Sequence, residues 1–383
     1  MPSALFFYFL PHTLYLFKNM CYNVSKTINE RSNRVSNLQD IVAPLLVWYR
    51  ENARSLPWRE RRAPYHVWIS EIMLQQTRIE AVIPYYHRFL TAFPTVAALA
   101  EAEDDLLMKH WEGLGYYSRA RNLKRAAVRI MTEHGGELPR DLALLRALPG
   151  VGDYTAGAIA SIAFGLPAPA VDGNVLRVLA RLTADGRNIL AEQVKREARE
   201  ALAAIYPSAP EDCADLTAAI MELGEVVCIP NGAPRCDACP LAALCRARAE
   251  GLTDTLPYRE KRPPRTVERR TVLLLTYEGR VGLALRPPEG LLGGLWEFPS
   301  ADGHLTAEEV RELLALWGLT PTDVTEGPTA KHIFTHREWH MTSFTVSLAG
   351  EGGGLTFATP EELRTVYALP TAFRRFAAQY LAE

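Results

Sequence analysis

Four cysteines stand close together in the second half of the chain, Cys228, Cys236, Cys239 and Cys245, with seven, two and five residues between them. Four thiolates at this spacing can close around one centre, and both zinc and iron–sulfur clusters bind such sets. The chain holds six cysteines in 383 residues, whereas disulfide scaffolds are short and spread their cysteines. The pattern therefore predicts a metal or cluster site in a reducing compartment, and the spacing alone slightly favours zinc.

A glycine-rich turn lies upstream, in the stretch LPGVGDYTAGAIA at 148–160. Gly150 and Gly152 permit a sharp turn that exposes backbone N–H groups, and such donors beside the start of a helix suit a phosphate oxygen. An ordinary turn between two helices fits the spacing as well. Asp172 follows in AVDGNVLRVLAR, at the start of a predicted helix, where a helix N-cap accounts for it without any chemistry.

A single glutamate, Glu71, stands in the apolar run VWISEIML. Burial of a carboxyl in such surroundings disfavours its charged form, so we expect a raised pKa for Glu71. A lone glutamate on an apolar helix is, on spacing alone, more often a surface or hydrogen-bonded residue than a functional one.

Helical patterns run through most of residues 38–225, because apolar residues recur at three- and four-residue spacing. We therefore predict an all-helical domain of about ten short helices. Residues 257–270 hold six basic and two acidic residues with three prolines, a composition typical of a linker. Beyond it we predict a small α+β domain, with strands around a turn at Glu278-Gly279, a helix at 306–317, a strand in 340–350 and a helix at 371–382.

Composition indicates a globular protein, with 48% hydrophobic and 22% charged residues. The net charge is −2, so any nucleic-acid surface has to be local. The apolar run at 4–17 is too short to span a bilayer and contains Pro11. We expect residues 1–37 to be a disordered or misassigned extension, with a membrane or export signal as the alternative. We also expect a monomer, because no long apolar heptad pattern is present.

Together, LPGVG, V-D-G-N-V and the four-cysteine loop resemble the helix-hairpin-helix DNA glycosylase superfamily, whose catalytic carboxylate stands at the position of Asp172. The endonuclease III-like and MutY-like members carry a [4Fe–4S] cluster on cysteines normally spaced six, two and five residues apart. The resemblance implies a [4Fe–4S] cofactor on the four cysteines here. The first gap is one residue longer in this chain, within a Pro/Gly loop (IPNGAPR) that can bulge.

The stretches PYHVWISEIMLQQTR (64–78) and GLGYYSRARNL (113–123) resemble MutY-type adenine DNA glycosylases, over about residues 38–380. This resemblance implies that Glu71 protonates the target adenine, which is a poor leaving group when neutral. It implies that Asp172 stabilises the oxocarbenium sugar or adds to it, assisted by Tyr154 and Asn174. Glycosylases with lyase activity place a lysine at position 154 to form a Schiff base, so Tyr154 argues against strong lyase activity.

Other matched positions concern DNA. The adenine has to be flipped out of the stack, and the resemblance implies that Gln76 and Tyr116 fill or wedge the duplex beside the opposing base. On spacing alone, an exposed glutamine and a core aromatic residue explain them as well. Arg54 and Arg59 lie near the family's adenine-pocket arginines, whereas Ala218 stands where the family often has Glu or Gln. A run of basic residues suits phosphates, although a solvated helix face reads similarly: Arg119, Arg121, Lys124, Arg125 and Arg129.

The last domain resembles a Nudix-like fold without its metal-binding glutamates, because Ala315 and Leu316 stand in their place after Arg311-Glu312. We therefore expect no nucleotide hydrolysis. In MutY-type enzymes this domain recognises 8-oxoguanine through a Phe-Ser-His loop, which here reads Phe334-Thr335-His336. Thr335 keeps the hydroxyl and adds a methyl group.

The expected architecture is thus multidomain: an all-α helix-hairpin-helix glycosylase domain with an iron–sulfur loop, followed by an α+β Nudix-like domain. Its expected parts are an extension (1–37), the glycosylase domain (38–227, hairpin at 144–160), the cluster loop (228–245), a basic linker (246–270) and the Nudix-like domain (271–383).

The expected function is excision of adenine opposite 8-oxoguanine or guanine in double-stranded DNA, in the bacterial cytoplasm at the nucleoid and without a membrane partner. Two alternatives remain. One is an endonuclease III-like enzyme acting on oxidised pyrimidines, which Tyr154 and the last domain oppose. The other is a non-catalytic lesion-binding protein or a nucleotide-pool hydrolase, which the two carboxylates and Ala315-Leu316 oppose.

Overall fold

The structure is a computed structural model that describes residues 38–261 and 263–381. The chain forms two compact units. The first holds the described residues up to Val67, with Arg140–Arg146 and Val151–Glu260. The second holds Trp68–Pro139, Ala147–Gly150 and the chain from Lys261 onward. The predictions for residues 1–37 lie outside the described residues.

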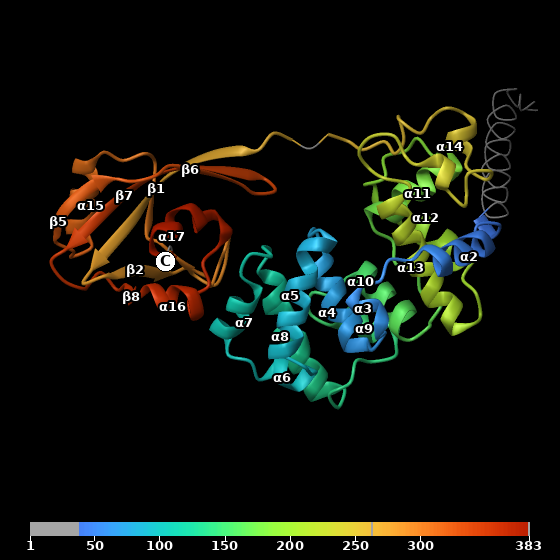
Figure 1. The fold of residues 1–383 in the computed structure, drawn as a ribbon, viewed down its shortest axis with the longest axis horizontal. Coiled ribbons are helices and arrows are strands. Elements are labelled where there is room, and N and C mark those ends of the chain that lie inside the picture. The colour runs from blue at the N-terminus through green and yellow to red at the C-terminus, as the bar shows by residue number, and fades with distance from the viewer. Residues whose placement is uncertain (1–37, 262, 382–383) are drawn as a thin grey trace, which may run out of the picture. The chain divides into compact units, whose positions relative to one another are not determined.

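The first unit is helical (Figure 1). Its elements are α2 (Val42–Asn52), α3 (Pro57–Glu60), the start of α4 (Pro64–Leu74), α9 (Leu142–Ala147), α10 (Asp153–Ala158), a π-helical turn (Ile159–Ala163), α11 (Gly173–Thr183), α12 (Glu192–Ala203), α13 (Pro210–Val226), a 3₁₀ turn (Cys236–Ala238) and α14 (Arg246–Ala249).

The core of the first unit lies around α13, which packs against α2 and α11. Leu45 of α2 and Leu216 and Ala219 of α13 are fully buried there. Pro210 opens α13, where its missing N–H costs no hydrogen bond. Gly224 lets α11 approach α13, because a Cβ at Gly224 would lie 2.8 Å from the Cβ of Asn174.

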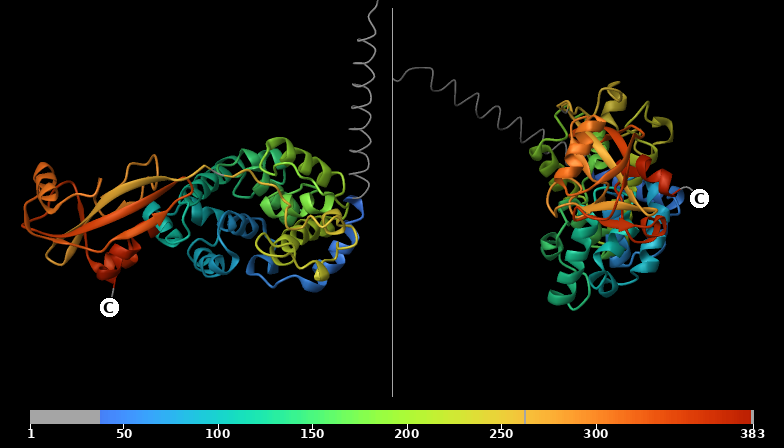
Figure 2. Two further views of the ribbon diagram at one scale, coloured as in Figure 1. Left: turned by 90° about the horizontal axis from the view of Figure 1, so that it is seen from above. Right: turned by 90° about the vertical axis from the view of Figure 1, so that its left-hand side faces the viewer.

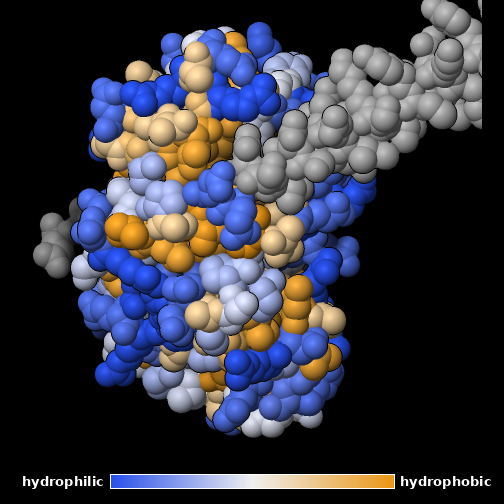
Figure 3. Space-filling model, turned by 90° about the vertical axis from the view of Figure 1, so that its right-hand side faces the viewer, coloured by the Kyte–Doolittle hydropathy of each residue, from blue (hydrophilic) through white to orange (hydrophobic). Residues whose placement is uncertain are grey.

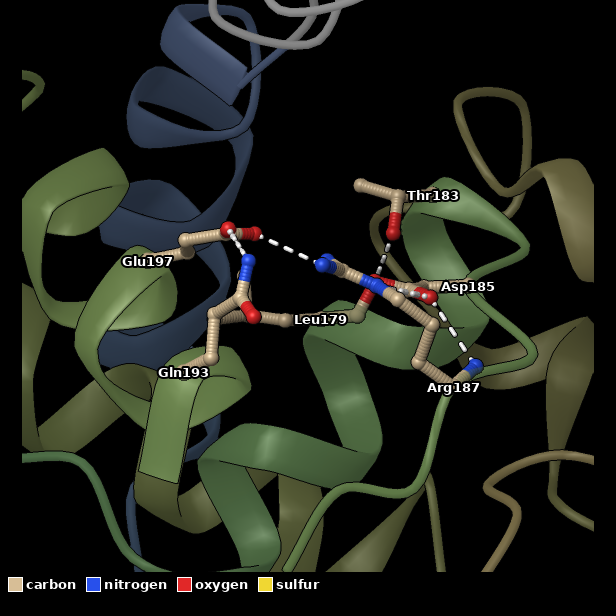
Figure 4. Close-up of polar contacts among 6 residues, drawn as sticks. All are labelled: Leu179, Thr183, Asp185, Arg187, Gln193 and Glu197. Carbon is tan, nitrogen blue, oxygen red and sulfur yellow. Dashed lines mark hydrogen bonds and ion pairs between the residues drawn. The ribbon is translucent and has the colours of Figure 1, made fainter. Parts of the chain in front are cut away.

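A hollow of about 280 Å³ lies between α11 and α12, over an apolar floor that includes Leu176 and Leu179. Arg187 at its rim is held between Asp185 and Glu197 (Figure 4). The hydrogen bond that Arg187 donates to the Asp185 carboxylate is the main cause that raises the pKa of Arg187. The face drawn in Figure 3 mixes hydrophobic and hydrophilic residues.

The second unit begins with a helical part, in which the rest of α4 is followed by α5 (Ile79–Ala92), α6 (Val96–Ala100), α7 (Asp104–Trp111) and α8 (Ser118–Glu133). The long helix α8 is amphipathic: Ala120, Leu123 and Ile130 are buried on one side, at the three- and four-residue spacing that the sequence showed. The helical prediction for residues 38–225 is confirmed.

The remainder of the second unit is a mixed sheet with helices on both faces (Figures 1 and 2). Its elements are β1 (Thr266–Tyr277), β2 (Arg280–Leu285), β3 (Trp296–Glu297), β4 (Ser300–Asp302), α15 (Ala307–Leu316), β5 (Pro321–Glu326), β6 (Ala330–Ile333), β7 (Arg337–Leu348), β8 (Thr356–Ala358), α16 (Pro360–Thr365), a 3₁₀ turn (Thr371–Phe373) and α17 (Arg374–Leu381).

The long strands β1 and β7 pair in parallel at the centre of the order β3-β2-β1-β7-β5. Successive residues of a strand face opposite sides of a sheet. Val272 and Leu274 therefore pack towards α16 and α17, and Leu273 and Leu275 towards α15. The predicted turn lies between β1 and β2, with positive φ at Glu278 and Gly279. The predicted α+β domain is confirmed, and β1 begins at Thr266, inside the range predicted as linker.

No helix in the described ranges is long and apolar enough to cross a bilayer.

Candidate functional site

Asp172 caps the start of α11 in the first unit. Its Oδ1 accepts hydrogen bonds from the backbone N–H groups of Asn174 and Val175, at 2.9 and 2.8 Å. Oδ2 accepts none from the described residues, so one carboxylate oxygen stays available. Burial raises the pKa of Asp172, against the opposing effect of the two hydrogen bonds and of Arg177. Asp172 can therefore both cap α11 and act in chemistry, because each role uses a different carboxylate oxygen.

Asn174 and the cysteine loop share a buried arginine that the sequence analysis missed. Arg177 is 2% exposed. It donates hydrogen bonds to Asn174 Oδ1 at 2.8 Å, to the carbonyl of Gly224 at 2.7 Å and to the carbonyl of Cys228 at 2.7 Å. One side chain thus fixes the start of α11, the end of α13 and the first cysteine.

Tyr154 stands in the first turn of α10, with its hydroxyl 3.8 Å from Met221 Sδ. The neighbouring Asp153 forms ion pairs with Arg146 and with Arg199. Gly152 is the N-cap residue of α10. The first turn of this helix thus carries Tyr154 and Asp153 and no lysine.

Arg54 and Arg59, the predicted adenine-pocket arginines, both bind one glutamate. Glu222 on α13 accepts from Arg54 Nε at 2.6 Å and from Arg59 Nη2 at 2.7 Å. Its side chain is 1% exposed. Burial alone raises the pKa of Glu222, but the hydrogen bonds from the two arginines outweigh burial and hold that pKa below its usual value. Ala218 lies one turn earlier on α13, in the core.

Four thiols line one hollow in the first unit, together with Arg181 and Arg248. These are the predicted ligands Cys228, Cys236, Cys239 and Cys245. Arg181 Nη1 donates to Cys228 Sγ at 3.2 Å. A set of four thiols around one hollow fits the donor chemistry of a zinc or iron–sulfur centre, although among the described residues no group of three or more His, Cys, Asp or Glu stands close enough to hold a metal ion.

The loop between Cys228 and Cys236 contains an exposed bulge. The N–H of Arg235 donates to the carbonyl of Val227 at 2.9 Å, which closes the loop directly before Cys236. Pro230 to Ala233 are exposed, and Gly232 has a φ of +79°. The chain before Cys236 is therefore anchored next to Cys228, whatever the conformation of the bulge.

Glu71 lies on α4 in the second unit and is 5% exposed. Its neighbours Trp68, Ile72 and Met73 are buried as well. The apolar run around Glu71 therefore marks a buried helix, and the expectation that its carboxyl has a raised pKa stays a prediction.

Arg119 on α8 holds the end of α4 and the loop at 113–116. Its guanidinium donates to three carbonyls at the end of α4 at 2.7–2.8 Å, and to the carbonyls of Leu114 and Gly115 at 3.1 Å. Burial lowers its pKa to about 10. The interpretation of Arg119 as a phosphate-binding residue is wrong, because the side chain points inward and is 8% exposed.

The other basic residues of α8 are engaged differently. Arg121 donates to the carbonyl of Gly293 at 2.6 Å, and Lys124 pairs with Asp104. Arg129 pairs with Glu133 and also donates to the carbonyl of Ala147.

Gly150, in the predicted hairpin, has a φ of +75°, and a Cβ there would come within 2.7 Å of Asn122 Cβ. The hairpin glycine is thus required both by its backbone conformation and by its contact with α8.

The proposed wedge residues and the Phe334-Thr335-His336 loop line a single hollow of about 760 Å³ in the second unit. Gln76 and Tyr116 have φ values of +58° and +46°, which non-glycine residues adopt rarely and at some cost. Arg119 fixes the carbonyls beside both of them. The hydroxyl groups of Tyr116 and Thr335 are hydrogen-bonded at 3.0 Å.

Phe334 packs edge-on against Trp339, with ring centroids 4.9 Å apart, and its carbonyl accepts from Arg265. The loop is therefore anchored on both sides. On α15, Ala315 and Leu316 are exposed, and neither side chain has an atom that can ligate a metal ion.

Comparison with known proteins agrees with this arrangement. A sequence model of the HhH-GPD superfamily base excision DNA repair protein matches residues 69–204, and a NUDIX domain model matches 271–379. A solved thermostable thymine-DNA glycosylase is similar over 58% of this chain and 99% of its own, with 27% identity and a TM-score of 0.50.

Two curated relatives cover more of the chain. The adenine DNA glycosylase of Rattus norvegicus is 34% identical over 89% of this chain and 78% of its own length. The human adenine DNA glycosylase is 34% identical over 88% and 73%. With both the helical and the Nudix-like parts matched, the chain belongs to the adenine DNA glycosylase family.

Proposed function

We propose that this protein is a monofunctional glycosylase that hydrolyses the N-glycosidic bond of adenine paired with 8-oxoguanine or guanine in duplex DNA. The observation that carries the proposal is the hollow lined jointly by Gln76, Tyr116 and the Phe334-Thr335-His336 loop. A wedge beside a reader of the opposing base suits a mispair enzyme, and the relatives named adenine DNA glycosylases supply the excised base.

Glu71 is the proposed general acid. Adenine leaves readily only when a ring nitrogen is protonated, and a buried carboxyl that keeps its proton can supply it. The flipped adenine has to leave the stack to meet Glu71. Burial of Glu71 on α4 supports this role.

Asp172 is the proposed partner of the sugar. As the bond breaks, the sugar gains oxocarbenium character, and a nearby carboxylate stabilises it or adds to it. The capping hydrogen bonds hold Oδ1, which leaves Oδ2 to face the cation. Tyr154 and Asn174 assist, and without an amine at position 154 no Schiff base forms there, so strand cleavage is not part of the reaction.

DNA contacts are shared among several elements in this proposal. The hairpin with Gly150 and Gly152 binds the backbone, and Arg54 and Arg59 approach the adenine from their pair with Glu222. Thr335 and Tyr116 present neighbouring hydroxyls to the opposing base. We further propose a monomer that works at the bacterial nucleoid.

For the cofactor we propose a [4Fe–4S] cluster held by Cys228, Cys236, Cys239 and Cys245. The cluster would supply a rigid support for the loop. The chain supplies the rest: Arg181 donates to Cys228 Sγ, and Arg177 ties the Cys228 carbonyl to α11. Visible absorption with iron and sulfide in the purified protein supports this, whereas a colourless zinc protein contradicts it.

The test is single-turnover excision from a duplex with one adenine opposite 8-oxoguanine. Wild type is compared with Glu71→Gln and with Glu80→Gln, an exposed glutamate on α5 that serves as the matched control. Adenine opposite thymine and an oxidised pyrimidine are the control substrates. We expect excision of the mispaired adenine, strand breakage only after alkali, and loss of both in Glu71→Gln alone. Excision of the pyrimidine with unaided strand cleavage contradicts the proposal, as does binding without excision.

A further inference from the structure

The C-terminal domain has a second hollow that the proposed function leaves unused. It measures about 920 Å³ and lies between β6 and the segment formed by the 3₁₀ turn and α17. Its charged lining residues within the described chain are all basic: Lys331, Arg374 and Arg375. His332 lines both this hollow and the hollow of Tyr116 and Thr335.

Two of these charges are not compensated. Lys331 forms an ion pair with Glu338 at 2.5 Å. Arg374 and Arg375, at the start of α17, are exposed and form no ion pair with any residue that the structure describes. The groove therefore offers two free guanidinium groups, and the planar fork of N–H donors on each can bind two oxygens of one phosphate.

The basic groove continues into the hollow of Tyr116 and Thr335. His332, Thr371 and Ala372 line both. His332 also packs edge-on against Phe334, with ring centroids 4.5 Å apart. A ligand strand that reaches Thr335 can therefore pass His332 and enter the basic groove without leaving the protein surface.

We propose that this groove binds the sugar–phosphate backbone of the DNA strand that holds the base opposite adenine, with Arg374 and Arg375 each contacting a phosphate. The identity of the ligand rests on the proposed function. Thr329 and Thr371 line the same groove, and threonine hydroxyls are donors of the kind that position DNA backbones.

The lining favours nucleic acid over an acidic protein. Protein interfaces depend on large buried anchors, chiefly aromatic residues. The apolar residues of this groove are small, namely Pro328, Ala330, Ala372 and Ala378. Free arginines over small residues provide charge without a pocket for such an anchor.

The test measures the affinity of the full-length protein, in a Glu71→Gln background, for an 8-oxoguanine:adenine duplex at several salt concentrations. Arg374→Gln/Arg375→Gln is compared with Arg311→Gln/Arg364→Gln, which removes the same charge from exposed helical positions outside both hollows. Log affinity falls as log salt concentration rises, and the loss of two phosphate contacts makes this slope shallower by about 2. The control pair is expected to keep the parent slope.

A second arm shortens the duplex stepwise from either end. The difference between the groove variant and its parent is expected to vanish when one end is removed and to persist when the other is removed. The proposal is overturned if the groove variant and the control variant have equal slopes. It is also overturned if the difference between the groove variant and its parent does not depend on which end of the duplex is shortened. Before binding is measured, the thermal midpoints of both variants are compared with that of the parent protein, so that lost affinity is not mistaken for unfolding.

The two proposals fail separately. If wild type excises the adenine but the groove variant keeps the parent slope, only the groove assignment falls, and an acidic protein partner becomes the better reading. If wild type neither binds nor excises the mispair, the proposed function falls and the groove proposal falls with it.

Discussion

The start of α11 and the end of α4 each present a proposed reacting carboxylate, but they are held in opposite ways. Asp172 is fixed by N–H groups two and three residues further along the same helix. The end of α4, just beyond Glu71, is fixed by Arg119 from another helix, through carbonyls on both α4 and the 113–116 loop. Asp172 is thus held by two backbone N–H groups of its own helix, whereas the end of α4 depends on the side chain of one arginine from another helix.

The largest effect is therefore expected from Arg119→Ala. Several buried carbonyls lose their donor together, and each unsatisfied group costs about 1–3 kcal/mol. We expect a loss of at least about 3 kcal/mol in the free energy of unfolding, measured by urea denaturation, and faster hydrogen exchange at the end of α4 and in the 113–116 loop.

Arg119→Lys tests whether charge alone suffices. A lysine ammonium cannot fork to both segments, so we expect exchange protection to be recovered in one segment only. An unchanged urea midpoint for Arg119→Ala contradicts the comparison.

A smaller loss is expected from Arg177→Met, which removes a donor to three acceptors in the first unit. We expect about 2 kcal/mol in stability and a lower content of bound metal per chain. Arg187→Met is the matched control, because its ion pairs are partly exposed and such pairs contribute about 1 kcal/mol or less. Equal losses in the two variants contradict a special role for Arg177.

At Asp172, stability and activity should separate. Asparagine still caps a helix, whereas alanine costs about 1 kcal/mol. We expect Asp172→Asn to keep or raise the thermal midpoint, Asp172→Ala to lower it, and both to lose excision in the single-turnover assay. Full excision by Asp172→Asn contradicts the proposed chemical role, and equal midpoints for the two variants contradict the capping role.

The smallest effect concerns pH. Burial raises the pKa of Asp172, against Arg177 and the capping hydrogen bonds and with some help from Glu225. The folded state therefore holds this proton more tightly than the unfolded state, so its stabilising contribution is complete below the unfolded pKa and is lost as pH rises through the folded pKa. We expect Asp172→Asn to gain stability relative to wild type as pH rises from acid towards neutral. A difference that is flat or of opposite sign contradicts this.

The same contrast explains what the sequence could reveal. Asp172 before Gly-Asn indicates an N-cap because capping partners are close in sequence, and the apolar run around Glu71 indicates a buried helix. The strands and helices of the C-terminal domain are likewise local patterns. The partners of Arg119, Arg177 and Glu222 lie up to 168 residues away, so no spacing rule points to them.

The basic run on α8 shows how such patterns mislead. Five basic residues without an acid resemble a phosphate-binding stripe, but one faces inward and three others are engaged with acidic side chains or carbonyls. Only the packing of α8 distinguishes these cases. In the C-terminal domain, the adjacent Arg374 and Arg375 give a weaker sequence signal, yet the structure leaves both exposed.

The hydrogen bond between Arg235 and Val227 has a consequence for how related chains are recognised. This hydrogen bond fixes the end of the loop, directly before Cys236, beside its start at Val227. The exposed bulge between them is therefore a place where residues can be gained or lost at little cost in stability. Search patterns that demand one fixed spacing between the first two cysteines would then discard genuine members. Defining the pattern from the closure onward, with the first gap left variable, would retain them.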